Sequence, residues 1–139
     1  MARIRYLVDT SVFARLSKPN VAAAFAPYAA TGQVGICAPV AFEIGYSTRS
    51  HADYLILAER LLAFAAVPLS ASDHERSLEI QLALSAKGQH RALSLVDALV
   101  SAAAEARQMT ILHYDGDYEM VAGITGQKHE WIVPRGTAD

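Results

Sequence analysis

The stretch Ile4-Arg5-Tyr6-Leu7-Val8-Asp9-Thr10-Ser11 decides the fold class of this chain. Its first part, as far as Val8, is short, largely apolar and rich in β-formers, which is typical of a buried strand. The polar side chains of Asp9, Thr10 and Ser11 then offer caps for a helix that we expect to run through Leu16. A buried strand that passes directly into a helix predicts an α/β protein.

The rest of the chain repeats this alternation. Short apolar segments predict further strands at 34–37, 67–69, 110–112 and 131–133. Helical patterns between them predict helices at 21–30, 40–47, 52–64, 72–87, from 94 onward and at 118–124, the fourth opened by a capping box from Ser72 to Glu75. We therefore expect a single domain over 1–139, with a central, mainly parallel sheet flanked by helices.

Composition excludes several classes of protein. The chain has 139 residues, of which 53% are hydrophobic and 19% charged, so it can bury a core and is not a disordered segment. Its 12 basic and 14 acidic residues give a net charge of −2, which excludes a polybasic surface as the main way of binding nucleic acid. No apolar run is long enough to span a membrane. Cys37 is the single cysteine, is expected in the core, and fits the reducing cytoplasm.

Four acidic residues stand where the predicted topology places them near one edge of the sheet. Asp9 follows the first strand, Asp115 lies just beyond the strand at 110–112, and Asp97 is in the first turn of a helix. Glu43 lies in a mostly apolar helical stretch, where an unpaired charge would be costly unless it faces solvent.

Each of these residues alone also fits a helix cap or a turn. Together they would repel one another, and a divalent cation relieves that repulsion. Oxygen ligands favour Mg²⁺ or Mn²⁺, which can activate water and stabilise charge on a phosphate.

At these positions the chain resembles a PIN domain, and within that superfamily the VapC toxins. The resemblance covers nearly the whole chain and rests on four segments: Val8-Asp9-Thr10-Ser11, Glu43 after Pro39, 94–104, and His113-Tyr114-Asp115-Gly116-Asp117-Tyr118. It implies a PIN-like three-layer α/β/α fold. It also implies a metal-dependent endoribonuclease that acts as the toxin of a VapBC toxin–antitoxin system and hydrolyses RNA phosphodiesters through a carboxylate-bound Mg²⁺ or Mn²⁺.

The resemblance also implies roles for individual residues. It places Asp9, Glu43, Asp97 and Asp115 in the catalytic acidic pocket, with Asp9 and Asp97 as direct metal ligands. Supporting roles then fall to Thr10 and Ser11, which can hydrogen-bond a carboxylate or a phosphate, and to Asp117 as a further acid. The implied partners are RNA and a VapB-like antitoxin, in a homodimer or a toxin–antitoxin hetero-oligomer in the cytoplasm.

An acidic pocket needs a basic rim if RNA is to approach it. We expect phosphate contacts from Arg15, Lys18, Arg49 and Arg91, although ordinary solvated charges would give the same pattern. Phe42 is expected to pack in the core. An alternative to the nuclease is a catalytically idle PIN-like module that docks an arginine-bearing partner in its acidic pocket, and metal-dependent turnover distinguishes the two.

Overall fold

The computed structural model describes residues 3–139, and its strands form one five-stranded sheet in the order β3-β2-β1-β4-β5. All four pairings between neighbouring strands are parallel, as the sequence predicts. The strands are β1 (Tyr6–Val8), β2 (Val34–Ile36), β3 (Ala65–Ala66), β4 (Thr110–His113) and β5 (His129–Trp131).

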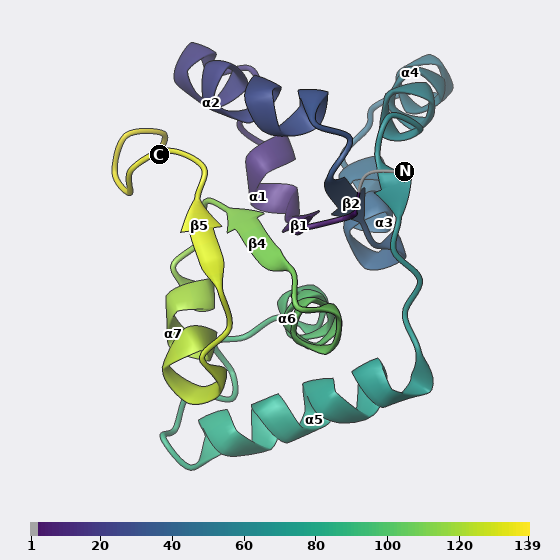
Figure 1. Ribbon diagram of the computed structural model, residues 1–139. Coiled ribbons are helices and arrows are strands. Elements are labelled where there is room, and N and C mark those ends of the chain that lie inside the picture. The colour runs from purple at the N-terminus through teal and green to yellow at the C-terminus, as the bar shows by residue number, and fades with distance from the viewer. Residues whose placement is uncertain (1–2) are drawn as a thin grey trace.

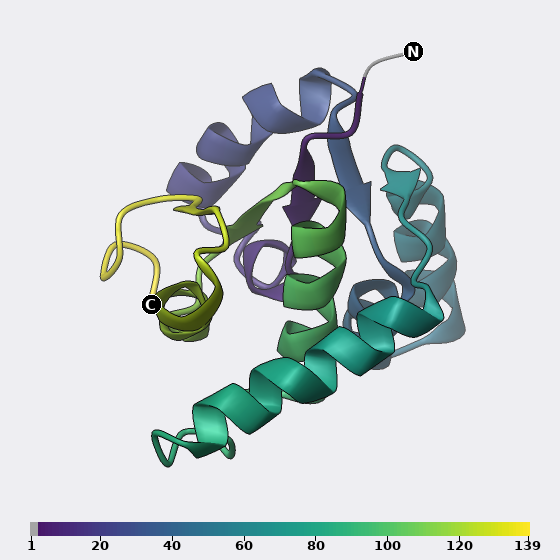
Figure 2. The same ribbon diagram turned by 60° about the horizontal axis from the view of Figure 1, so that its bottom comes forward.

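Helices cover both faces of this sheet. They are α1 (Thr10–Phe13), α2 (Pro19–Ala30), α3 (Ala38–Tyr46), α4 (His51–Leu61), α5 (Ala71–Ser85), α6 (Leu95–Arg107) and α7 (Asp117–Thr125). Figure 1 shows α6 and α7 on one side of the strands and α1 and α2 on the other. Figure 2 shows α5 lying across α6 as an outer helix. The predicted three-layer α/β/α fold is confirmed.

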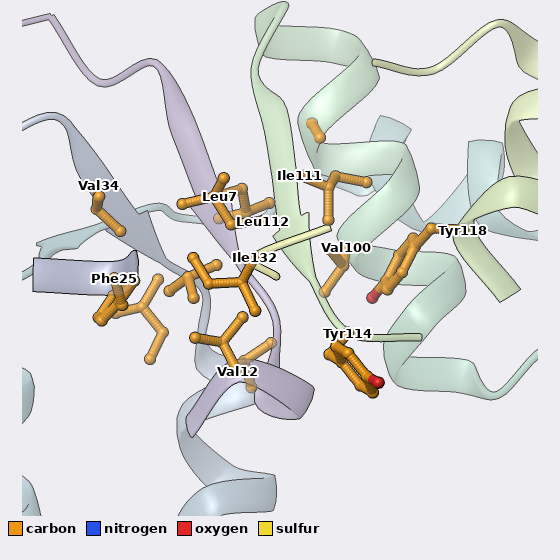
Figure 3. Packing of buried hydrophobic residues seen from close by; sticks show 14 of the residues in the cluster. Leu7, Val12, Phe25, Val34, Val100, Ile111, Leu112, Tyr114, Tyr118 and Ile132 are labelled. Atoms are coloured by element: carbon orange, nitrogen blue, oxygen red, sulfur yellow. The ribbon is translucent and has the colours of Figure 1, made fainter. Parts of the chain in front are cut away.

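The core lies between the sheet and its helices (Figure 3). Leu7 and Val8 of β1 have no exposed surface, because a central parallel strand is covered on both faces. Val12 of α1 and Val100 of α6 are equally buried, as is Cys37, which is confirmed as a core residue. In the described part of the chain, no helix is both long and apolar enough to cross a membrane.

Two predicted strands are displaced along the chain. β3 ends at Ala66 rather than covering 67–69, because Val67 donates its last ladder bond to Ile36 and Pro68 has no N–H to continue. β5 occupies His129–Trp131 instead of 131–133. It pairs with β4 from Ile111 to His113, and β4 ends there. The apolar 132–133 segment, which suggested the later strand, is buried just beyond the sheet.

Two predictions about helices are wrong. α5 begins at Ala71 after Ser70, so its first turn is organised by Ser70 and Asp73 and not by a box from Ser72 to Glu75. Phe42 is 78% exposed on α3, because the buried face of that helix carries Val40 and Ile44 and not Phe42. Apolar character alone did not reveal which side of this short helix faces the core.

The last residues of the chain fold back onto the turn after β4. The Tyr114 hydroxyl accepts backbone N–H groups from Gly136 (2.8 Å) and Ala138 (3.0 Å) and donates to Asp139 Oδ1 (2.7 Å). The Arg15 guanidinium Nε donates to the carbonyl of Ala138 at 3.0 Å. Segment 134–139 is thereby held against the turn after β4 and against Arg15, which follows α1.

Candidate metal centre

Three carboxylates meet at the carboxyl edge of the sheet. Asp9 follows β1 and caps α1, Asp97 lies in the first turn of α6, and Asp115 follows β4. One oxygen from each of the three lies within 4.8 Å of the other two. Because all strands are parallel, β1 and β4 deliver their following residues to the same edge, as the sequence predicts.

Asp9 is held by hydrogen bonds within its own turn. Its Oδ2 accepts the Ser11 backbone N–H (3.1 Å) and the Ser11 hydroxyl (2.6 Å). The Ser11 oxygen in turn accepts the backbone N–H of Tyr114 at 2.9 Å. Ser11 therefore ties the turn after β1 to the turn after β4 and orients the carboxylate, while a supporting role in catalysis stays a prediction.

Asp97 is a buried carboxylate without a paired cation in the described part of the chain. Its side chain is 8% exposed, and no lysine or arginine of residues 3–139 forms an ion pair with it. Burial, and then the charges of Asp9 and Asp115, raise the pKa of Asp97 to about 7, against a partial lowering by the Tyr118 hydroxyl. The folded chain therefore concentrates negative charge here at a cost in free energy.

Asp115 is fixed through the backbone. Its N–H donates to His113 Nδ1 at 3.0 Å, and its Oδ1 accepts the backbone N–H of Asp117 at 2.9 Å. His113 is fully buried, and burial together with His129 lowers its pKa to about 3, so it stays neutral. With Nδ1 accepting, the proton lies on Nε2, which donates to His129 Nδ1 at 2.8 Å.

Asp117 lies at the border of the cluster. It is half-buried, and burial followed by the charges of Asp115 and Asp9 raises its pKa. Its oxygens are not within the group of three.

The donor set fits a hard divalent cation. Three carboxylates without a basic partner in the described chain are the ligands that Mg²⁺ and Mn²⁺ prefer. Two buried side-chain hydroxyls in the described part of the chain also lack a hydrogen-bond partner. They are Thr10 Oγ1, from the residue after Asp9 in the sequence, and Ser101 Oγ, one helical turn after Asp97. The chemistry of the three carboxylates is what a bound cation with its water would complete, and Thr10 and Ser101 follow two of them closely in sequence.

Glu43 is not part of this group. It is exposed on α3, a helix that packs against both α1 and α6. The structure thus brings together three of the four predicted acids and leaves Glu43 at the surface. Whether any of them acts in catalysis stays a prediction.

The predicted basic rim is only partly free. Arg15 donates to the carbonyls of Ala138 and Ser11, and its guanidinium carbon lies 4.7 Å from the centre of the Tyr114 ring. Lys18 donates to the Asp139 carbonyl at 2.9 Å. Both side chains therefore hold the C-terminal segment. This role could not be predicted from the sequence, because their partners are more than a hundred residues away.

Arg49 and Arg91 are exposed, as phosphate contacts would be. Two residues near the cluster were missed as candidates: Tyr118, which contacts Asp9 and Asp97, and Arg135, beside Asp115. Tyr118 stands within the 113–118 motif, but the sequence does not reveal where its hydroxyl points.

Comparison with known proteins gives consistent matches. The family model described as "PIN domain" matches residues 6–124. Two proteins of Mycobacterium tuberculosis are similar over almost their whole length. Ribonuclease VapC51 is 42% identical over 98% of each chain, and Ribonuclease VapC18 is 41% identical over 95% of this chain and 98% of its own.

Solved structures share the fold at low sequence identity. A chain from the crystal structure of DNA-bound VapBC from Salmonella typhimurium superposes with a TM-score of 0.76 at 15% identity, covering 94% of this chain and 99% of that one. A chain from VapBC2 of Rickettsia felis, bound to a DNA fragment from its promoter, gives a TM-score of 0.74 at 16% identity over 91% and 98%.

Proposed function

This chain belongs to the PIN-domain family and to the VapC proteins within it, and on that premise we propose that it is an endoribonuclease that uses a divalent metal ion. The observation that carries the proposal is the cluster of Asp9, Asp97 and Asp115, in which three carboxylates lie within 4.8 Å without a basic partner in the described chain. The similarity of the chain to proteins named ribonucleases supports RNA as the substrate.

In this proposal Asp9 and Asp97 hold the cation, and Asp115 completes the ligand charge. When bound, Mg²⁺ or Mn²⁺ would supply positive charge to the phosphate and make a nearby water more acidic. Ser11 keeps the Asp9 carboxylate oriented, and Thr10 offers a hydroxyl to the ligand shell or the phosphate.

The chemistry is a hydrolysis of the RNA phosphodiester. The water oxygen forms a bond to phosphorus, the bond to one ribose oxygen breaks, and that oxygen takes up a proton. Asp117 or Glu43, which lie outside the group of three, would orient the water or accept its proton. Glu43 would do so from an exposed position on α3.

We also propose a VapB-like antitoxin as partner in the cytoplasm, in a hetero-oligomer that can contain a toxin homodimer. Chains of the same fold were solved as VapBC complexes. Three large apolar side chains of α3 and the end of α4 are strongly exposed and suit a partner: Phe42 (78%), Tyr46 (86%) and Leu62 (83%).

Cleavage of a total RNA pool by the purified, partner-free chain tests the enzymatic proposal. We expect discrete products with Mg²⁺ or Mn²⁺, none in EDTA, and none from an Asp9→Asn/Asp97→Asn double variant. Asp53→Asn, which changes an exposed aspartate at the start of α4, is the matched control and should cleave normally. Undiminished cleavage by the double variant or in EDTA would contradict the proposal, and a folded chain that never cleaves would favour the idle docking module.

A further inference from the structure

A pocket of about 370 Å³ opens directly beside the acidic cluster. Ser11 and Asp115 line it on the side of the cluster. Arg15, Tyr114, Trp131 and Arg135 contribute two guanidinium groups and two aromatic rings to its other walls. Asp139 also lines the pocket, and its Oδ1 accepts the Tyr114 hydroxyl at 2.7 Å. The tail that carries Arg135 is fixed by three hydrogen bonds at the Tyr114 hydroxyl, so this wall exists before any ligand arrives.

Of the two arginines that line this pocket, Arg135 is the one available to bind a ligand, because Arg15 donates to the carbonyls of Ala138 and Ser11. Its guanidinium carbon lies 5.3 Å from the centre of the Trp131 ring, which backs the group and directs it. Within residues 3–139 its hydrogen bonding is limited to Glu119 at 3.3 Å, where the two side chains are 66% and 47% exposed. Such an exposed pair contributes little free energy and yields readily to a phosphate.

Gly116 also lines the pocket. A Cβ atom there would lie 3.1 Å from one terminal nitrogen of Arg135, so the guanidinium would have to shift by a few tenths of an ångström. The absent side chain lets the guanidinium lie against the turn that carries Asp115, and so next to the place where a scissile phosphate would meet the cluster.

We propose that this pocket binds an RNA phosphate adjoining the bond that is cleaved, with Arg135 as its principal cationic contact. The inference rests on the ribonuclease function proposed above. A guanidinium group pairs with two phosphate oxygens at once, and its positive charge offsets the repulsion between RNA and the three carboxylates.

Fluorescence anisotropy with short, labelled, single-stranded oligoribonucleotides of mixed sequence, in EDTA, tests the pocket without cleavage. Arg135→Gln should weaken binding about fivefold and reduce the salt dependence by about one ion. The matched control is Arg60→Gln, which removes an exposed charge at the end of α4, next to the opposite edge strand β3.

Equal affinity of wild type and Arg135→Gln, or equal losses in both variants, would overturn the inference. So would an Arg135→Gln loss confined to an acidic peptide, with RNA affinity unchanged. If the wild type cleaves RNA while Arg135→Gln binds normally, only the pocket fails. If the wild type does not cleave, the proposed function fails.

A second observation concerns the inside of the cluster. Tyr118 is 1% exposed, and its hydroxyl lies 2.7 Å from Asp9 Oδ1 and 3.2 Å from Asp97 Oδ1. Its ring centre lies 4.9 Å from that of His113, which accepts the N–H of Asp115.

We infer that Tyr118 is a positioning residue, whose hydroxyl sets the separation of Asp9 and Asp97 before a cation binds. The hydroxyl carries one proton, and the shorter distance shows that it donates mainly to Asp9 Oδ1 (2.7 Å). Asp97 Oδ1 also lies within hydrogen-bonding distance of the same oxygen (3.2 Å), so the hydroxyl bridges the two carboxylates. The ring fixes the hydroxyl in place, because it packs in the core and against His113.

Titration with Mn²⁺, followed by electron paramagnetic resonance or calorimetry, tests this role without RNA. Tyr118→Phe keeps the ring and should weaken Mn²⁺ binding about tenfold. Tyr28→Phe is the control, since it likewise removes a hydroxyl that donates to a carboxylate, Glu130 Oε2 at 2.8 Å, outside the acidic cluster. Unchanged Mn²⁺ affinity in Tyr118→Phe, or an equal loss in Tyr28→Phe, would overturn the role, whatever happens to the melting temperature.

Discussion

The first turns of α5 and α6 carry the same local motif in opposite electrostatic surroundings. Each helix follows a serine and has an aspartate as its third residue: Ser70 with Asp73, and Ser94 with Asp97. Both aspartates are buried, at 1% and 8% exposure. In sequence they are equivalent.

Their partners differ. Asp73 receives two hydrogen bonds from Arg107, at 2.9 and 3.2 Å, and two from Ser70. Burial acts to raise the pKa of Asp73, but these donors outweigh it and hold the pKa below its ordinary value. Asp97 has no cation in the described chain, and its pKa is raised to about 7. Removing one partner of a compensated buried acid destabilises the fold, whereas an uncompensated buried acid is available to a ligand.

The largest expected effect separates the two aspartates by activity. Asp97→Asn should reduce metal-dependent RNA cleavage about 100-fold or more, because the cluster loses a cation ligand. Asp73→Asn should leave cleavage by folded protein within about twofold of wild type. Initial rates with Mn²⁺, normalised to the folded fraction, measure both, and equal losses in the two variants would contradict the distinction.

The next largest expected effect is a difference in the free energy of unfolding between the Asp73→Asn and Asp97→Asn variants. Asp73→Asn should lower the free energy of unfolding by about 3 kcal/mol, because it leaves the Arg107 guanidinium without its buried counter-charge. Asp97→Asn should leave it equal or higher in EDTA, because it relieves repulsion. Urea denaturation measures the difference, with Asp53→Asn as the exposed member of a third Ser-x-x-Asp motif. A loss in Asp97→Asn as large as in Asp73→Asn would refute this comparison.

The contrast also shows how far the sequence could predict this molecule. The strand ending at Asp9 and the parallel topology could be anticipated, and with them the meeting of Asp9, Asp97 and Asp115, because alternating apolar segments impose that arrangement. Local patterns are sufficient there because strand direction alone determines which edge a residue reaches.

The environments of the side chains could not be predicted in this way. Whether Asp73 meets Arg107, or Asp97 meets Tyr118, depends on tertiary packing between distant segments. The same holds for Arg15, whose hydrogen bond to the Ala138 carbonyl joins segments more than a hundred residues apart. For Glu43 the sequence predicts the helix but not its exposed position on α3, and a role for Glu43 at the site stays a prediction.

A smaller effect follows from pH. The folded-state pKa of Asp97, about 7, lies above its ordinary value of 3.8, so between these values the folded chain binds more protons than the unfolded chain. Stability from this group is therefore full at low pH and falls as pH rises toward 7, by about 1 kcal/mol or more. Asp73 has the opposite sign, and its contribution is lost only in acid, as pH falls through its lowered pKa.

Chemical denaturation in EDTA from about pH 5 to about pH 8 checks these signs. Wild type should lose stability across this window, Asp97→Asn should lose less, and Asp73→Asn should follow the wild-type slope from a lower starting point. Saturating Mn²⁺ should flatten the wild-type slope, since bound cation replaces the proton. A wild-type slope that Asp97→Asn leaves unchanged would place the neutral-pH titration in another group.

The smallest expected effect is a difference in Mn²⁺ affinity between variants of the two capping serines, Ser94 and Ser70. Ser94 Oγ accepts the N–H of Asp97 at 3.1 Å, and the Ser70 hydroxyl donates to Asp73 at 3.1 Å. Ser94→Ala and Ser70→Ala should each cost about 1 kcal/mol of stability. Only Ser94→Ala should also weaken Mn²⁺ binding, because Ser94 fixes the turn that presents Asp97, whereas Asp73 keeps Arg107. Equal Mn²⁺ affinities in the two variants would mean that packing of α6 alone positions Asp97.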